Sequence, residues 1–176
     1  MMPTPDELIL AVLSARPQHG YQLLELFRDP EQLGHIWDMS AAQVYAVLKR
    51  LEHNGEILGL VIEAEDAPAR VEFRTTRRGR ARMMAWLDES DPPASIRRVR
   101  VDFLSRMYAA AAISSPTEAI VSRQYAACEA ERGRIAAQFD LTAAKPARLA
   151  LSLQLAQYDA ILTWMKQTFN LDTVSK

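Results

Sequence analysis

Residues 40–55 constrain the fold most, because this segment marks both ends of a helix. Ser40 is a favoured N-cap residue, and Gln43 stands at the third helical position, where it completes a capping box. Asn54 and Gly55 supply a C-terminal stop. Between these ends, four apolar residues recur at helical spacing: Val44, Val47, Leu48 and Leu51. The segment therefore predicts a self-contained helix with one buried face.

The opposite face of this helix carries the side-chain types that DNA-reading helices use. Small residues come first, followed by an amide, a phenol and cations: Ala41, Gln43, Tyr45, Ala46, Lys49, Arg50 and His53. Small residues let a helix approach base edges, an amide can pair with adenine, and cations and hydroxyls bind phosphate. Taken alone, this face fits an ordinary amphipathic surface helix equally well.

A β-hairpin is predicted directly after the helix. Residues 57–64 are rich in Ile, Leu and Val, residues 65–68 interrupt the run, and residues 70–75 alternate as a strand does. Two helical patterns come earlier, and the first is predicted to have Thr4 as N-cap, Pro5 at N1 and Glu7 in a capping box. Three helices followed by a two-stranded wing is the order of a winged helix-turn-helix domain. In such domains the third helix enters the major groove and the wing follows the DNA backbone.

Three short elements of this region resemble the PadR family of bacterial transcriptional regulators. They are His19-Gly20-Tyr21 at the start of the second helix, the spacing of Val44-Tyr45, Leu48, Leu51-Glu52 and Gly55 in the third, and Phe73-Arg74 with Thr76 and Gly79 at the end of the wing. The remaining chain resembles the longer helical C-terminal domain that pairs PadR subunits. The resemblance covers nearly the whole sequence and implies a DNA-binding regulator, most often a repressor.

The resemblance also implies roles for individual residues. Tyr45 would contact phosphate, the turn from Ser40 to Gln43 would face the bases, and arginines of the hairpin would belong to the wing. The complete set of predicted DNA-binding residues is Ser40, Ala41, Gln43, Tyr45, Lys49, Arg50, Arg70, Arg74 and Arg77. The family usually has lysine and tyrosine, or similar residues, where this chain has Val71 and Glu72. The predicted tip, residues 63–66, is acidic, so we expect this wing to hold DNA less strongly.

The formal net charge of −1 argues against indiscriminate polyanion binding. Cations nevertheless cluster on the third helix and between Arg70 and Arg82, so a modest, salt-sensitive affinity for DNA is expected. The arginines after Thr76 lie on a further predicted helix, residues 76–90, and are interpreted partly as its solvated face. The main alternative function is a winged-helix scaffold or protein-interaction module without DNA binding. An excess of acidic over basic residues up to Asp91 favours this alternative.

Pro92 and Pro93 mark a predicted boundary between a DNA-binding domain, residues 1–91, and a helical dimerisation and sensing domain, residues 92–176, because consecutive prolines stop a helix. Three helices are predicted after the boundary, over residues 95–113, residues 115–139 with Pro116 at N1, and from about residue 146. The expected fold class is therefore mainly α, a winged helix-turn-helix with a two-stranded wing followed by a three-helix domain.

The last predicted helix carries two apolar surfaces. One repeats at alternating steps of four and three, as a coiled-coil seam does: Leu151, Leu155, Tyr158, Leu162, Met165 and Phe169. Beside it lie Leu149, Leu153, Ala156, Ala160, Ile161 and Trp164. A helix that is apolar on two sides needs two partners, so we assign the seam to a homodimer, with burial of both surfaces in one chain as the alternative. An isologous dimer would place two recognition helices about 34 to 36 Å apart and read a near-palindromic operator.

Other function classes find little support in the sequence. The three histidines lack the paired spacing of a metal-binding helix, and no glycine-rich phosphate loop or nucleophile elbow is present, so neither catalysis nor a metal or cofactor is expected. The lone Cys128 excludes a disulfide within the chain. A cytoplasmic protein is expected, since the N-terminus lacks a signal pattern and no apolar run could span a membrane. A small aromatic effector that shifts the C-terminal helices is conceivable, with Trp86 and Trp164 as its candidate contacts.

Overall fold

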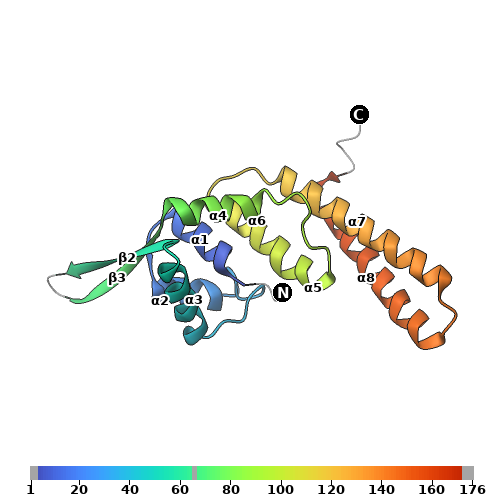
Figure 1. Cartoon of the computed structure of the whole chain (residues 1–176), viewed down its shortest axis with the longest axis horizontal. Helices are drawn as coiled ribbons and strands as arrows, with labels where there is room; N and C mark the ends of the chain where they lie inside the picture. The colour runs from blue at the N-terminus through green and yellow to red at the C-terminus, as the bar shows by residue number, and fades with distance from the viewer. Residues whose placement is uncertain (1–3, 65–66, 172–176) are drawn as a thin grey trace. The chain divides into compact units, whose positions relative to one another are not determined.

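Helices dominate this computed structural model, which describes residues 4–64 and 67–171, and they accompany one small antiparallel sheet (Figure 1). The elements are α1 (Asp6–Ala15), β1 (Gln18–His19), α2 (Gly20–Arg28), α3 (Ala41–His53), β2 (Ile57–Ala64), β3 (Ala67–Thr75), α4 (Arg77–Leu87), α5 (Ile96–Arg98), the π-helix η1 (Val99–Phe103), α6 (Leu104–Ala112), α7 (Glu118–Leu141) and α8 (Lys145–Phe169). The described residues form two units. One contains the chain up to Glu89 and Leu104–Pro116, and the other contains Ser90–Phe103 and the chain from Thr117 onward.

The first unit is a winged helix-turn-helix, as the sequence predicts. Its core is built around α1, whose residues from Leu8 to Leu13 are all buried. This helix packs against α4, α6 and β3, while α2 packs against α3. A helix that is covered on nearly all sides explains why α1 is apolar all round rather than on one stripe.

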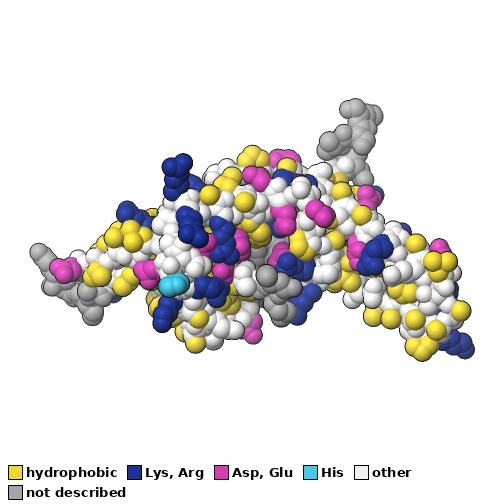
Figure 2. Space-filling view, in the orientation of Figure 1, with side chains coloured by type: hydrophobic (Ala, Val, Ile, Leu, Met, Phe, Trp, Pro, Cys, Tyr) yellow, Lys and Arg dark blue, Asp and Glu magenta, His cyan; other side chains and the backbone are white. Residues whose placement is uncertain are grey.

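The sheet has three strands in the order β1-β3-β2, one more than predicted. In the hairpin, Val61 pairs with Val71, and several apolar side chains of both strands are exposed along it (Figure 2). The additional strand β1 has two residues and pairs Gln18 with Phe73. Two residues are too few to show the alternation that identifies a strand in a sequence. Of the predicted acidic tip, Glu65 and Asp66 lie outside the described residues.

Two predicted helix starts are wrong. Helix α1 begins at Asp6 with Pro5 in the cap position and no side-chain cap, instead of a Thr4 cap with a Glu7 capping box. Asp6 and Glu7 face arginines of other helices, which satisfies their carboxylates without a cap. Helix α7 begins at Glu118 after Thr117, two residues later than Pro116 at N1 implies. At the start of α1, tertiary ion pairs therefore replace the predicted cap. No contact explains the later start of α7.

The helix predicted over residues 95–113 contains an unexpected π-helical segment, η1. An enlarged turn of this kind shifts the buried face of a helix. As a result, Val101 and Asp102 are buried here, whereas Ile96 and Leu104 are only partly buried. Asp102 is paired with Arg98 at 2.8 Å.

Helix α6 belongs to the first unit, although it follows the predicted boundary at residue 91. It packs on α1, and Ser105 accepts a hydrogen bond from the Trp37 indole at 2.9 Å. Tyr108 donates a further hydrogen bond to Gln32 at 2.8 Å. The functional division between the two predicted domains stays a prediction.

The second unit is centred on the packing of α7 against α8. Here the predicted dimerisation seam must be corrected, because it faces the interior of its own chain. Tyr158 is only 2% exposed, Leu162 and Met165 are also buried, and the other seam residues, Leu151, Leu155 and Phe169, are partly buried. The second apolar surface of α8 remains open instead, with Leu149 72% and Leu153 61% exposed. Periodicity identified both surfaces but not which one α7 covers. No helix among the described residues is long and apolar enough to cross a membrane.

Candidate nucleic-acid interface

Helix α3 begins and ends where the sequence predicts. The Gln43 backbone N–H donates to the Ser40 hydroxyl at 3.3 Å, and the Ser40 backbone N–H donates to the Gln43 side-chain oxygen at 2.8 Å. Gly55 follows the helix with a φ of 68°, a left-handed conformation that favours glycine. The predicted stripe of four apolar residues is fully buried. Both predicted cap residues are thus occupied in fixing the helix start.

The exposed face of α3 carries small side chains in its first half and basic side chains in its second half. Ala42, Ala46, Lys49 and His53 lie along its outermost ridge, opposite the buried stripe, and all four are exposed. Ala41 is partly buried. Ala42 was missing from the predicted DNA-binding residues, although its spacing to Ala46 and Lys49 places it on the same ridge. A backbone flanked by alanines can approach base edges closely.

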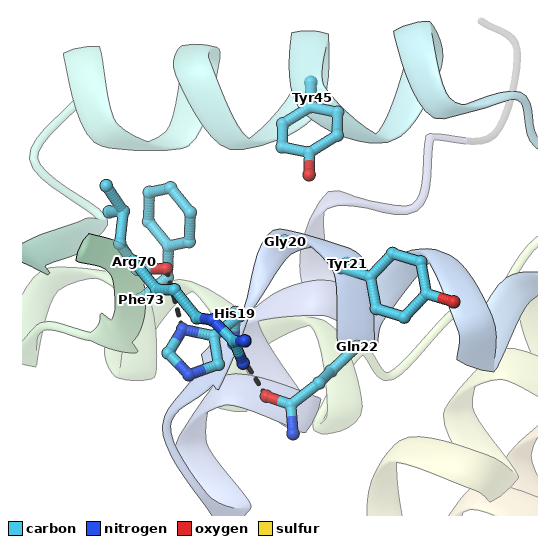
Figure 3. A pocket seen from close by; sticks show the side chains of 8 residues that line it. His19, Gly20, Tyr21, Gln22, Tyr45, Arg70 and Phe73 are labelled. Carbon is cyan, nitrogen blue, oxygen red and sulfur yellow. Dashed lines mark hydrogen bonds between the residues drawn. The ribbon is translucent and has the colours of Figure 1, made fainter. Parts of the chain in front are cut away.

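Tyr45 lies on one flank of this ridge and borders a cavity of about 660 Å³ (Figure 3). The cavity lies between the start of α2, the middle of α3 and strand β3. Its lining is His19, Gly20, Tyr21, Gln22, Tyr45, Arg70, Val71 and Phe73. The His19 N–H donates to the Gln22 side chain at 2.9 Å, and His19 Nδ1 is 3.1 Å from the Val71 carbonyl oxygen. The contact with Val71 links the start of α2 to the hairpin.

Gly20 allows the Tyr45 ring to reach the start of α2 (Figure 3). A Cβ added at Gly20 would lie 2.6 Å from a ring carbon of Tyr45 and 3.2 Å from its hydroxyl oxygen. Any other residue at position 20 would displace the ring. The contact leaves Tyr45 about half exposed, so its hydroxyl can still meet a partner from solution.

The predicted wing cations Arg70, Arg74 and Arg77 are all exposed. Because side chains alternate along a strand, Arg70 and Arg74 share one face of β3, with Glu72 between them. Arg77 opens α4 immediately after the hairpin. The sequence therefore placed these three cations correctly at the surface, but a carboxylate divides two of them.

Arg50 lies on the other flank of the ridge and is held by an ionic cluster that the sequence did not reveal. This Asp6 cluster consists of Asp6, Glu7, Arg50, Glu56 and Arg82. Arg50 donates to both carboxylate oxygens of Asp6, at 2.5 Å from Nη2 and 3.2 Å from Nε. The hydrogen bond to Asp6 raises the pKa of Arg50 above its ordinary value.

Arg82 occupies the centre of the Asp6 cluster rather than a solvated face, so that interpretation is corrected for this residue. It contacts Glu7 and Glu56 at 2.8 Å and Asp6 at 3.3 Å. Burial alone would lower the pKa of Arg82, but the hydrogen bond to Glu7 and the surrounding carboxylates raise it. The face of the first unit in Figure 2 accordingly mixes basic and acidic side chains over α1, α3 and α4.

A family comparison bears directly on this arrangement. Residues 9–85 match the model of the transcriptional regulator PadR-like family. This part of the chain is therefore similar to a PadR-like domain. The match includes α2, α3 and the whole hairpin, and it favours a regulator over an enzyme. Among the residues that the structure describes, no group of three or more His, Cys, Asp or Glu side chains could hold a metal ion.

Solved structures of similar fold include Bacillus subtilis PadR in complex with operator DNA. It is 21% identical, with 96% of this chain and 99% of that chain covered and a TM-score of 0.48. The PadR-like transcriptional regulator BC1756 from Bacillus cereus is 20% identical, with 96% of each chain covered and a TM-score of 0.45. Bacillus subtilis PadR in complex with p-coumaric acid is 19% identical, with coverages of 93% and 92% and a TM-score of 0.42. The curated proteins gave no significant match.

The three PadR-like sequence elements have distinct structural roles. His19-Gly20-Tyr21 and Phe73 border the cavity together with Tyr45. Thr76 accepts from the Gly79 N–H at 3.2 Å and donates to the Gly55 carbonyl at 2.8 Å, which links the end of α3 to the start of α4. A Cβ at Gly79 would lie 2.1 Å from the Glu56 carbonyl oxygen, so only glycine fits there. The residues of the PadR-like pattern thus hold α3 in place against α2, α4 and the hairpin.

The two candidate ligand contacts are both partly engaged within the chain. The Arg106 guanidinium lies 5.4 Å from the centre of the Trp86 ring in the first unit. In the second unit, Trp164 packs edge to face with Phe103 and Phe169, at centroid distances of 6.3 and 5.7 Å. Their role toward a ligand stays a prediction.

Proposed function

We propose that this chain is a sequence-specific DNA-binding transcriptional regulator that inserts the exposed face of α3 into the major groove. The observation that carries the proposal is the ridge of Ala42, Ala46 and Lys49 in a PadR-like domain, held outward by a fully buried stripe. Small side chains permit close approach to base edges, and Lys49 supplies charge for the backbone.

The cavity beside Tyr45 is the proposed seat of a backbone phosphate. Its chemistry supports this role, since Tyr45 offers a hydroxyl and Arg70 offers a guanidinium next to the start of α2. Helix N-termini, hydroxyls and arginines are common phosphate partners in protein–DNA complexes. Arg74 and Arg77 would extend the contact along the duplex.

We further propose that two chains pair through the open apolar surface of α8. Leu149, Leu153 and Trp164 project from this surface, and exposed apolar side chains in such number suggest a protein partner. A twofold pair would match a near-palindromic operator. The first unit would then read DNA, and the second would set the spacing between the two reading helices.

Repression and release by an effector complete the proposed mechanism. A small molecule that shifts the C-terminal helices would change the spacing of the two recognition helices and weaken binding. The resemblance to a family of bacterial regulators that mostly repress supports repression. It also supports action in the cytoplasm, where a bacterial chromosome lies.

Selection of DNA fragments by the purified protein tests the proposed function. Sheared DNA from the source genome is incubated with the protein, and bound fragments are recovered and sequenced. A regulator should enrich fragments that share a near-palindrome, with half-site centres about 10 base pairs or a multiple apart. Bound fragments without a common sequence would reject sequence-specific recognition, and recovery of no fragments would favour the scaffold alternative.

A further inference from the structure

Arg50 combines two features that conflict in a DNA-reading helix. It follows Lys49 on α3 and its side chain is 45% exposed, so its position is within reach of a bound duplex. Its Nε and Nη2 donors, however, are both directed at Asp6. A guanidinium bound side-on to a carboxylate uses the same geometry that it would offer to phosphate. Arg50 cannot present this edge to Asp6 and to DNA at the same time.

The Asp6 carboxylate is fixed in place, unlike the guanidinium that covers it. Its side chain is 5% exposed, and it lies in the first turn of α1, which is buried in the core of the first unit. It also accepts from Arg82 at 3.3 Å. Asp6 therefore cannot follow Arg50 toward a phosphate, so any contact of DNA with the Nε–Nη2 edge of Arg50 must break the pair.

The charge balance of the Asp6 cluster allows the charge of Asp6 to be removed without leaving Arg82 unpaired. The cluster holds three carboxylates, from Asp6, Glu7 and Glu56, but only two guanidiniums. Arg82 keeps Glu7 and Glu56 as partners when the charge of Asp6 is removed. Loss of that charge therefore leaves two acids facing two bases, rather than an unpaired buried cation.

We propose that Asp6 limits the affinity of this chain for duplex DNA, because it withholds Arg50 from the DNA backbone. The inference rests on the proposed function of α3. Phosphate contacts raise affinity for every sequence equally, whereas base contacts distinguish the operator. By occupying Arg50, Asp6 lowers binding to every duplex by the same factor, and discrimination rests on the small residues of the ridge.

The test compares wild-type protein with Asp6→Asn on the selected operator and on a scrambled duplex, across a salt series. Asparagine keeps the shape of the side chain but removes its charge. We expect Asp6→Asn to bind the scrambled duplex more tightly, with a log–log salt slope steeper by about 0.9. This slope corresponds to about a threefold larger loss of binding between 50 and 200 mM salt. Binding to the operator should rise by the same factor, so the preference for the operator over the scrambled duplex should stay unchanged.

Two further variants isolate the role of Arg50. Arg50→Met should keep the wild-type salt slope, because Arg50 makes no phosphate contact while Asp6 holds it. Asp6→Asn/Arg50→Met should lose the extra slope of the single Asp6→Asn variant. Glu7→Gln is the control within the cluster, since Glu7 contacts Arg82 but not Arg50, and it should keep the wild-type slope.

The opposite results would overturn the inference. If Arg50 bound phosphate with Asp6 as its support, Asp6→Asn would weaken binding and Arg50→Met would reduce the slope by about 0.9. An unchanged slope in folded Asp6→Asn would equally reject it. Should Asp6→Asn fail to fold, the slope of Arg50→Met decides alone. Wild-type protein that binds no DNA at all would instead reject the proposed function, which keeps the two failures distinct.

Discussion

Gly20 and Tyr45 lie close together in the proposed DNA interface. The space of a missing Cβ at Gly20 is filled by the Tyr45 ring, which links the start of α2 to the middle of α3. The ring is half exposed, so it can move aside without opening the core. A single methyl group at position 20 can therefore displace a proposed phosphate contact while leaving the fold intact.

Gly20→Ala should weaken operator binding without unfolding the protein. The added Cβ would lie 2.6 Å from the Tyr45 ring and must push it out of its present position. Loss of one hydrogen bond to phosphate should weaken operator binding by about tenfold, while the salt slope should not change because a neutral phenol displaces no counterion. Stability should change by only about 1 kcal/mol. Fluorescence anisotropy across a salt series measures the affinity and the slope, and thermal unfolding measures the stability.

Gly133→Ala is the matched control for this prediction, because a Cβ at Gly133 in α7 meets no atom within 4 Å. It should bind DNA as wild-type protein does. If Gly20→Ala also bound with unchanged affinity, the assignment of Tyr45 to phosphate would be rejected.

The contrast between Ser40 and Arg50 shows which single-residue roles a sequence can reveal. The cap of α3 was predictable, because Ser40 and Gln43 lie three positions apart and their bonding is local. The partner of Arg50 was not, since Asp6 precedes it by 44 positions and only the fold brings them together. The same long-range cluster explains why Arg82, which looked solvated in sequence, is engaged with three carboxylates.

At the scale of elements, α8 makes a part-buried hydrogen bond from its own seam. The Tyr158 hydroxyl donates to the Ala94 carbonyl at 3.0 Å within the second unit. Burial, with added effects of Glu131 and Cys128, raises the pKa of Tyr158 to about 12. The folded state thus favours the neutral phenol, whose ordinary pKa is about 10.

Tyr158→Phe should destabilise the protein by about 1 kcal/mol near neutral pH, through loss of this hydrogen bond. Because the folded pKa is raised, the stability linked to Tyr158 is fully present below about pH 10 and is lost as the pH rises through about 12. The difference in unfolding free energy between wild-type protein and Tyr158→Phe should therefore shrink over this range. Urea unfolding monitored by circular dichroism at several pH values measures it.

Tyr21→Phe serves as the control, since Tyr21 is exposed on α2. Its difference from wild-type protein should stay small at every pH. A difference for Tyr158→Phe that remained constant between pH 9 and 12 would contradict the role given to the buried phenol.

Helix existence was easier to predict from this sequence than helix partnership. The repeat along α8 and the hydrophobic run of β2 are local signals, and both elements form as expected. The same repeat could not tell whether Tyr158 and Met165 meet α7 or a second chain, because both partners would bury the same seam. Strand β1 and the π-helical η1 escaped prediction since each is short and depends on its neighbours.

At the scale of the whole molecule, the central prediction is the pairing of two chains. The open surface of α8 retains Leu149 and Leu153 as exposed apolar residues after α7 has covered the seam. The winged-helix order was predictable from local patterns, but the return of α6 to the first unit was not, since no pattern in the sequence indicates it.

Leu153→Asp should convert a dimer into single chains while each chain stays folded. The side chain is 61% exposed, so a charge there costs little within one chain but would be unpaired and buried between two. Light scattering at working concentration gives the mass, and circular dichroism reports the helices. Gln154→Asp, on an exposed neighbouring position, should keep the wild-type mass. Equal masses for wild-type protein and Leu153→Asp would reject this surface.

The most direct measurement of the account compares operator binding by wild-type protein and Lys49→Ala across a salt series. Lys49 lies on the outer ridge of α3, and Lys145 at the start of α8 provides an exposed control cation. We predict that Lys49→Ala binds more weakly and lowers the log–log salt slope by about 0.9, while Lys145→Ala matches wild-type protein. If Lys49→Ala kept both the affinity and the slope of wild-type protein, the exposed face of α3 would not be the surface that meets DNA.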